Sequence, residues 1–180
     1  MWDNSGAMHI QEVIKIISQM EAQGVIERYA IGGAVGATFY LEPVATLDVD
    51  IFVSFKAQSG SLILSLQPIF DYLKVHGGVL EGEHVMVAGW PVQILPSNTT
   101  LVEEALAQAV EKDVVGTIAR VFTPEHLAAI ALQTGRAKDK ARLLSFVESG
   151  VLDSERLQAI LVRHNLVTAW GKFQERFLDD

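Results

Sequence analysis

The run LDVDIFVSF, from Leu47 to Phe55, constrains the fold more than any other part of the sequence. An apolar, β-branched residue stands at every second position of its middle part: Val49, Ile51 and Val53. This alternation is typical of a β-strand that packs one face against a core. The opposite face then carries Asp48 and Asp50 side by side. We therefore expect a sheet in which one strand presents two carboxylates on a single face.

The remaining sequence divides into a mixed part and a helical part. Helical spacing of apolar residues from Ile10 to Met20 predicts a first helix that ends near Gly24. Further patterns predict helices at 34–41, 61–75 and 101–110, and strands at 28–31, 84–88, 92–95 and 114–121. Thr123 has the character of a helix cap, and only helices are expected after it, with breaks near 135, 150–153 and 165.

These patterns predict an α+β fold class. Residues 1–122 would form a mixed sheet with flanking helices, because strands and helices alternate there. Residues 123–180 would form a helical C-terminal segment packed on this core, either as a second unit or within one compact domain.

Composition limits the partners and the compartment. The net charge of −8 opposes broad electrostatic binding of nucleic acid, so we expect no extended nucleic-acid surface. The absence of cysteine excludes disulfides, thiolate metal sites and a cysteine nucleophile. We find neither a signal-peptide pattern nor the ~18 consecutive apolar residues of a membrane span. We therefore expect a cytoplasmic protein that does not associate with membranes.

Asp48 and Asp50 form the first candidate site. Their Cα atoms should lie about 6.6 Å apart, twice the rise of a strand, and like charges at this range repel each other. A Mg²⁺ or Mn²⁺ ion between them would remove the repulsion and prefers such oxygen ligands. A bare Asp-x-Asp is more often the polar face of an exposed edge strand, which needs no ligand.

Gly32 and Gly33 form the second candidate element. They stand between a predicted strand and a predicted helix, where backbone N–H groups can approach phosphate oxygens. A glycine pair at such a place can also serve only to allow a tight bend. The combination of this pair with Asp48 and Asp50 is more informative than either element alone.

Ile31-Gly32-Gly33, a short helix and then TLDVDI at 46–51 together resemble the signature of the nucleotidyltransferase superfamily. The likeness is greatest to the small branch that includes AbiEii-type toxins. The second landmark of that branch, a helix, is similar to TPEHLAAIALQTGRAKDKARL at 123–143. The resemblance extends from Tyr29 to about Trp170. It implies a polymerase-beta-like mixed sheet, an NTP as substrate and Mg²⁺ or Mn²⁺ as cofactor.

The resemblance also implies roles for individual residues. Asp48 and Asp50 would be catalytic and would bind the metal, while Gly32 and Gly33 would hold the triphosphate. Apart from the resemblance, Thr46, which directly precedes the predicted strand, could bond a phosphate or only fix the start of the strand.

The basic cluster after Gly135 is open to two interpretations. By the resemblance, Lys138 would contact the nucleotide phosphates or the acceptor. The alternative is a solvated helix face with local ion pairs, formed by Arg136, Lys138, Asp139 and Lys140. No pair of histidines has metal-ligand spacing, so we expect no metal or catalytic role for His9, His76, His84, His126 and His164.

Gln93 departs from the superfamily pattern. A third carboxylate on a later strand usually completes the metal site and helps to deprotonate the acceptor. The matching strand, PVQILP at 91–96, has Gln93 at that position. An amide coordinates metal weakly and cannot act as a base. Glu81 and Glu83, just upstream, are alternative sources of a third carboxylate.

Functions from different classes remain open at this point. The first is metal-dependent transfer of NMP from an NTP to a protein or RNA hydroxyl. The second is a non-catalytic module that binds a nucleotide or a partner protein and has lost the third carboxylate, as Gln93 suggests. The third is a purely structural domain that binds no nucleotide.

Overall fold

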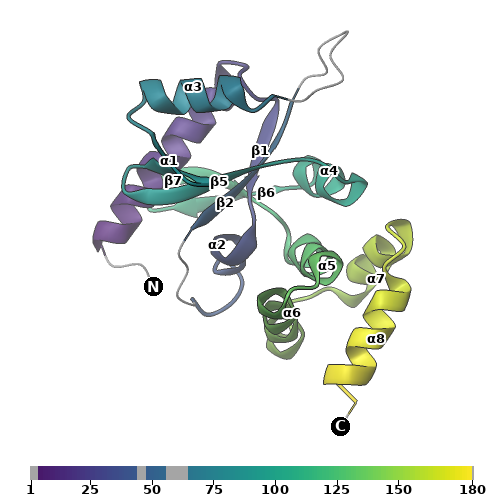
Figure 1. The fold of residues 1–180 in the computed structure, drawn as a ribbon. Coiled ribbons are helices and arrows are strands. Elements are labelled where there is room, and N and C mark those ends of the chain that lie inside the picture. Colours follow the sequence, from purple (N-terminus) through teal and green to yellow (C-terminus); the bar gives the residue numbers. More distant parts are fainter. Residues whose placement is uncertain (1–3, 44–47, 56–64, 180) are drawn as a thin grey trace.

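The computed structural model describes residues 4–43, 48–55 and 65–179 (Figure 1). The described helices are α1 Asn4–Ala22, α2 Gly33–Ala37, α3 Gln67–Val75, α4 Thr100–Ala107, α5 Pro124–Thr134, α6 Ala137–Ser149, α7 Ser154–Arg163 and α8 Val167–Phe177. The described strands are β1 Arg28–Ile31, β2 Val49–Ser54, β3 Val79–Glu81, β4 His84–Val87, β5 Trp90–Pro96, β6 Val110–Val114 and β7 Thr117–Val121. Strands and helices mix up to Val121, and the elements described after it are helices, as the sequence predicts.

The strands form one mixed sheet in the order β3-β4-β5-β2-β1-β7-β6. β2, which contains Asp50 and begins directly after Asp48, runs antiparallel to β1 on one side and parallel to β5 on the other. β1 also pairs parallel with β7, while β3–β4, β4–β5 and β6–β7 pair antiparallel. Because β2 has neighbours on both sides, the edge-strand interpretation of Asp48 and Asp50 is wrong.

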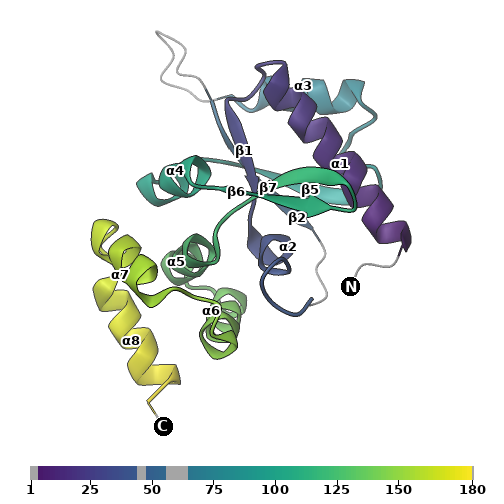
Figure 2. The same ribbon diagram turned by 180° about the vertical axis from the view of Figure 1, so that it is seen from behind.

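One face of the sheet is covered by α1 and α3 (Figures 1 and 2). The three β-branched residues of β2 point into this layer and are at most 1% exposed: Val49, Ile51 and Val53. The apolar stripe of α1 packs against the same layer and is buried too: Ile10, Val13, Ile14, Ile17 and Met20. This stripe is therefore part of the core and not a partner surface, a question that the sequence had left open.

The opposite face of the sheet carries α2, α4 and the C-terminal helices. Phe52 of β2 contacts Phe122, with ring centroids 4.9 Å apart, and α4 and α5 contribute to the same buried cluster. The cluster continues into α6, α7 and α8 through Phe146, Leu161 and Phe173. Asp48 and Asp50 therefore belong to the side of the sheet on which the helical segment packs. The boundary at residue 122 stays a prediction.

Several element ends follow from local chemistry. β1 has the predicted bounds, and the Thr123 hydroxyl accepts the His126 N–H at the start of α5. α5 and α6 end at glycines with positive φ, and Asn165 has a φ of 56° in the break after α7. α3 begins with Pro68 in its first turn; the predicted upstream part, 61–64, lies outside the described residues. No helix in the described ranges is long and apolar enough to span a membrane.

The single strand predicted at 114–121 is wrong. Two strands, β6 and β7, form a hairpin there around Val115 and Gly116. Both turn residues have positive φ, 50° and 83°, which matches a two-residue hairpin turn. β6 is mostly exposed and so lacks the apolar alternation that marks a half-buried strand. The helices predicted at 34–41 and 101–110 are shorter, ending at Ala37 and Ala107.

Candidate active site

Asp50 lies on β2, and Asp48 immediately precedes this strand. Burial raises the pKa of Asp50, and the charge of Asp48 raises it further. Lys138, Arg142 and Arg136 act in the opposite direction and lower this pKa. The Asp50 carboxylate is therefore held where water stabilises its charge poorly, and cations compensate for part of that loss.

Gly33 lies directly against the acid pair. Its φ is +57°, and a Cβ atom built at this position would lie 2.1 Å from Oδ2 of Asp50. No residue with a side chain fits there without moving the carboxylate. The neighbouring Gly32 is tight for another reason, because its Cβ would lie 2.5 Å from the ring of Phe52. The glycine pair thus brings bare backbone to the carboxylate of Asp50.

The backbone N–H of Gly32 already has a partner. It donates a hydrogen bond to the backbone oxygen of Asp50 at 3.0 Å, which ties the turn to β2. Gly33 is therefore the glycine of this pair whose backbone stands beside the carboxylate. Thr46, a further predicted phosphate contact, lies outside the described residues.

Gln93 lies opposite Asp50 in the parallel pairing of β2 and β5. The strand expected to carry the third acid is therefore next to the acid pair, and an amide stands at the register position of Asp50. Within the described residues, no group of three His, Asp or Glu side chains is arranged to hold a metal ion. The groups that could bind a metal ion here are the two carboxylates and the amide oxygen of Gln93. All of them are oxygen ligands of the kind that Mg²⁺ accepts.

His84, to which the sequence assigned no role, contacts the acid pair. Its Nε2 atom lies 3.0 Å from Oδ2 of Asp48, and both side chains are 32% exposed. His84 lies at the start of β4, the hairpin partner of β5, and β5 in turn pairs with β2. The contact depends on this strand order, so spacing along the sequence contained no signal for it.

A hollow of about 290 Å³ opens beside this contact. It is lined by Asp48, Glu81, His84, Met86 and Pro91. Glu81, one of the two alternatives for a third carboxylate, therefore lies in the same hollow as Asp48. Glu83, the other alternative, lies in the exposed turn between β3 and β4 and does not line the hollow.

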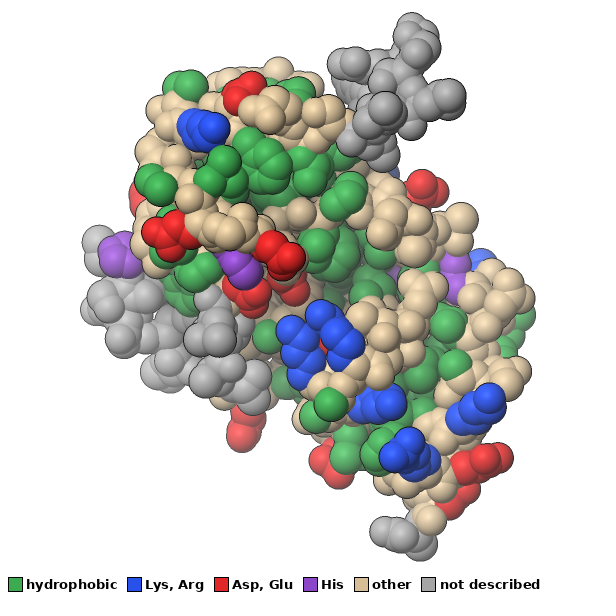
Figure 3. All heavy atoms as spheres, viewed as in Figure 1, with side chains coloured by type: hydrophobic (Ala, Val, Ile, Leu, Met, Phe, Trp, Pro, Cys, Tyr) green, Lys and Arg blue, Asp and Glu red, His purple; other side chains and the backbone are tan. Residues whose placement is uncertain are grey.

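The basic cluster at the start of α6 faces the acid pair. Figure 3 shows Lys and Arg side chains next to a group of Asp, Glu and His side chains in the middle of one face. The charges of Arg136, Lys138 and Arg142 all lower the pKa of Asp50. The side chain of Lys138 is exposed. Asp139 is buried between arginines, so it does not belong to a solvated helix face.

A second polar cluster joins α4 to the helical segment. Glu104 accepts hydrogen bonds from Arg163, from His164 and from His126, with the shortest distances at 2.6 Å. His126 is 1% exposed, and its other ring nitrogen lies 2.7 Å from the Thr123 hydroxyl. These bonds connect α4, α5 and the end of α7, and so tie the helical segment to α4.

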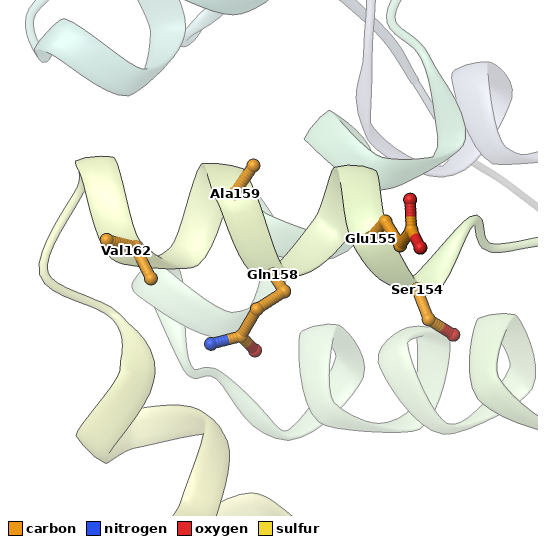
Figure 4. A pocket seen from close by; sticks show the side chains of 5 residues that line it. All are labelled: Ser154, Glu155, Gln158, Ala159 and Val162. Carbon is orange, nitrogen blue, oxygen red and sulfur yellow. The ribbon is translucent and has the colours of Figure 1, made fainter.

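Another hollow, of about 610 Å³, is a shallow surface on α7 (Figure 4). One face of that helix lines it: Ser154, Glu155, Gln158, Ala159 and Val162. It contains none of the acid-pair residues and only one ionisable side chain. This hollow is therefore separate from the candidate site at Asp48.

The sheet order, the acid pair on β2 and the flanking helices define a nucleotidyltransferase fold, as the sequence resemblance implied. No protein family and no curated protein sequence matches the chain. Solved structures do match. One is an antigenic nucleotidyltransferase-like protein from Paracoccidioides brasiliensis, with 16% identity, a TM-score of 0.55 and coverage of 91% of this chain and 92% of that chain.

Another similar structure is the antibiotic-resistance factor ANT(2'')-Ia. Its solution structure has 13% identity and a TM-score of 0.55, and covers 97% of this chain and 99% of that chain. A crystal structure of ANT(2'')-Ia in complex with adenylyl-2''-tobramycin has 12% identity, a TM-score of 0.53 and coverage of 88% and 96%. At these identities the likeness establishes the fold. The relationship to AbiEii-type toxins stays a prediction.

Proposed function

We propose that this protein is a metal-dependent nucleotidyltransferase that transfers NMP from an NTP to a hydroxyl group. One observation carries the proposal: the paired carboxylates of Asp48 and Asp50 lie between the bare backbone of Gly33 and the cations of α6. A triphosphate needs cations, and a metal ion needs oxygen ligands that remain charged. The α6 cations support the first requirement, and the carboxylates of Asp48 and Asp50 support the second.

Asp48 and Asp50 would hold the Mg²⁺ or Mn²⁺ ion. When bound, such an ion neutralises the charge that develops on the triphosphate. His84 donates to Asp48 and so restricts the orientation of that carboxylate. Gly33 admits the Asp50 carboxylate against its bare backbone, where the triphosphate is proposed to bind, and the exposed Lys138 contributes a cation whose charge acts on Asp50. Thr46 stays a proposed phosphate contact.

The acceptor is proposed to be a hydroxyl of a protein or an RNA. The net charge of −8 limits an RNA acceptor to a local contact, for which the α6 cluster provides the cations. A small-molecule hydroxyl is the second class to test, because one structurally similar protein, ANT(2'')-Ia, has been crystallised with adenylyl-2''-tobramycin.

A second candidate function is a non-catalytic module that binds a nucleotide or a partner protein. Gln93 favours it, because the residue opposite Asp50 cannot take the acceptor proton. A nucleotide-binding module would share the nucleotide site with the enzyme and differ from it in turnover. Replacing Gln93 by Asp discriminates between them: a large gain in transfer would identify the natural chain as a binding module that lost its catalytic base.

Thermal stability with ATP, GTP, CTP or UTP, each with and without Mg²⁺ or Mn²⁺, tests the shared site. Ligand at 100 times its Kd stabilises the folded state by about 2.7 kcal/mol, which is a clear rise in Tm. The rise should require the metal and should disappear in the variant with Asp48→Asn and Asp50→Asn. Arg156→Gln, an exposed residue of α7, is the control and should behave as wild type.

Turnover is then measured with radiolabelled NTP and three acceptor sets: protein, RNA and amino-sugar hydroxyls. Label on one acceptor, lost in the Asp48→Asn and Asp50→Asn variant, would establish the enzyme and its acceptor class. Metal-dependent binding without label on any acceptor would favour the binding module. A Tm that no nucleotide changes at millimolar concentration would contradict both transfer and nucleotide binding, and would leave the partner-binding module.

A further inference from the structure

Asp139 is a carboxylate that the fold buries at the first turn of α6. The residue is 2% exposed, although it stands beside the exposed Lys138 in the sequence. Burial of a carboxylate costs free energy unless cations and hydrogen-bond donors surround it. The structure supplies both, so the partners of Asp139 indicate its role.

Two arginines surround this carboxylate. Arg136 donates from Nε to Oδ2 at 2.7 Å and from Nη2 to Oδ1 at 3.3 Å, a two-point contact. Nη1 of Arg142 lies 3.6 Å from the same Oδ1. The backbone N–H of Arg136 also donates to Oδ2 at 3.3 Å. Asp139 thus determines the orientation of one guanidinium group and restricts the position of a second.

The two guanidinium groups differ in exposure but share a neighbour. The side chain of Arg136 is 57% exposed and that of Arg142 is 18% exposed. An arginine has five N–H donors, and Asp139 takes two from Arg136, which leaves three for another acceptor. The charges of both arginines lower the pKa of Asp50. The charge of Asp48, in turn, helps to raise the pKa of Arg136. The charges of the two guanidinium groups therefore reach the acid pair.

We infer that Asp139 is a positioning residue that holds Arg136 and Arg142 as a two-arginine clamp for the triphosphate of the bound nucleotide. This inference rests on the proposed function and deepens it. The clamp would act on the phosphate oxygens from the α6 side, while Asp48 and Asp50 act through the metal from the β2 side. Planar guanidinium groups suit this task because they bind phosphate at two points.

A role of Asp139 as a helix cap alone would not require its burial or its two arginine partners. To cap α6, Asp139 needs only the backbone N–H of Arg136, and an exposed carboxylate serves that purpose as well as a buried one. Burial against two arginines adds nothing to a cap. It does add a fixed direction to two cations, which a phosphate site requires.

The test is calorimetric titration of the full chain with the Mg²⁺-NTP that raises Tm most, and with the corresponding NMP. Arg136→Gln and Arg142→Gln should each weaken NTP binding about ten- to hundredfold, the value of a charge-assisted hydrogen bond, and NMP binding much less. Asp139→Asn should produce the same selective loss. In the double variant Asp139→Asn with Arg136→Gln, the losses should not add, because both act through one guanidinium group.

Arg156→Gln removes the same charge from exposed α7 and should leave both affinities unchanged. Equal loss of NTP and NMP binding in Asp139→Asn, or additive losses in the double variant, would overturn the clamp. If Asp139→Asn does not fold, unchanged NTP affinity in the two arginine variants overturns it. If wild type binds no Mg²⁺-NTP, the proposed function fails and the clamp with it; wild-type binding with normal arginine variants refutes the clamp alone.

Discussion

His84 donates a hydrogen bond from Nε2 to Oδ2 of Asp48 at 3.0 Å. The two residues are far apart in the sequence, and three neighbouring strands, β4, β5 and β2, bring them together. A carboxylate with one oxygen held in this way has a preferred direction for its second oxygen. Partners of this kind orient metal ligands, and their loss commonly weakens metal binding.

Replacement of His84 by Ala should therefore weaken metal-dependent NTP binding about tenfold or more, because Asp48 loses the donor that orients it. The change is read as a shift of Kd in calorimetric titration. His84→Gln keeps an N–H donor and should recover part of the affinity. Equal Kd values for wild type and His84→Ala would mean that the contact does not serve the site.

Gly33→Ala should destabilise the fold more than an ordinary glycine replacement. The left-handed φ of +57° costs a residue with a Cβ about 1–2 kcal/mol. The clash with Asp50 should add about 1–3 kcal/mol, the usual cost of overpacking. Urea unfolding measures the sum.

Gly24→Ala is the matched control for the clash. Gly24 has a φ of +77°, but nothing lies within 4 Å of a Cβ built there. Its replacement should show the backbone cost alone. If Gly33→Ala cost no more than Gly24→Ala, Asp50 would not lie against Gly33 as described.

Gln93→Asp should make stability depend on metal. A third carboxylate opposite Asp50 adds like-charge repulsion, so Tm without metal should fall. Mg²⁺ relieves this repulsion, so its stabilising effect should be larger in the variant than in wild type. The measurement is Tm against Mg²⁺ concentration. Gln93→Glu places the carboxylate on a longer side chain and so tests how strictly the metal site fixes its position. An unchanged response of Tm to Mg²⁺ in both variants would argue against a metal site here.

Glu104 should make the stability of the fold sensitive to acid. Its hydrogen bond from Arg163, with further bonds from His164 and His126, lowers the pKa of Glu104 to about 2. A depressed folded-state pKa means that this stabilisation is complete above the unfolded value of about 4.3 and is lost as pH falls toward 2. Glu104→Gln should therefore cost about 1–3 kcal/mol at pH 7 and almost nothing near pH 2.

Urea unfolding of wild type and Glu104→Gln across pH 2 to 7 measures this difference. His126 contributes in the same direction at higher pH, since burial lowers its pKa and stability falls as the unfolded chain takes up protons below about 6.5. A difference between wild type and Glu104→Gln that stays constant down to pH 2 would contradict the depressed pKa.

Local chemistry explains which elements the sequence alone could predict. The alternation in β2 requires only that one face be buried, and Val49, Ile51 and Val53 are indeed buried. The helix ends near Thr123, Gly135 and Asn165 depend on a capping hydroxyl or on a residue that tolerates positive φ. Where such local signals were missing, as in exposed β6, the prediction failed.

The sequence by itself therefore determined the fold class and the pairing of Asp48 with Asp50, because side-chain alternation and caps act over a few residues. Only the tertiary structure decided what surrounds that pair. Gln93, His84 and Gly33 meet it through the order of the strands. The charges of Arg136 and Arg142, which Asp139 holds, reach it because the helical segment packs on the same side of the sheet. These contacts join residues from separate elements, and no local spacing records them.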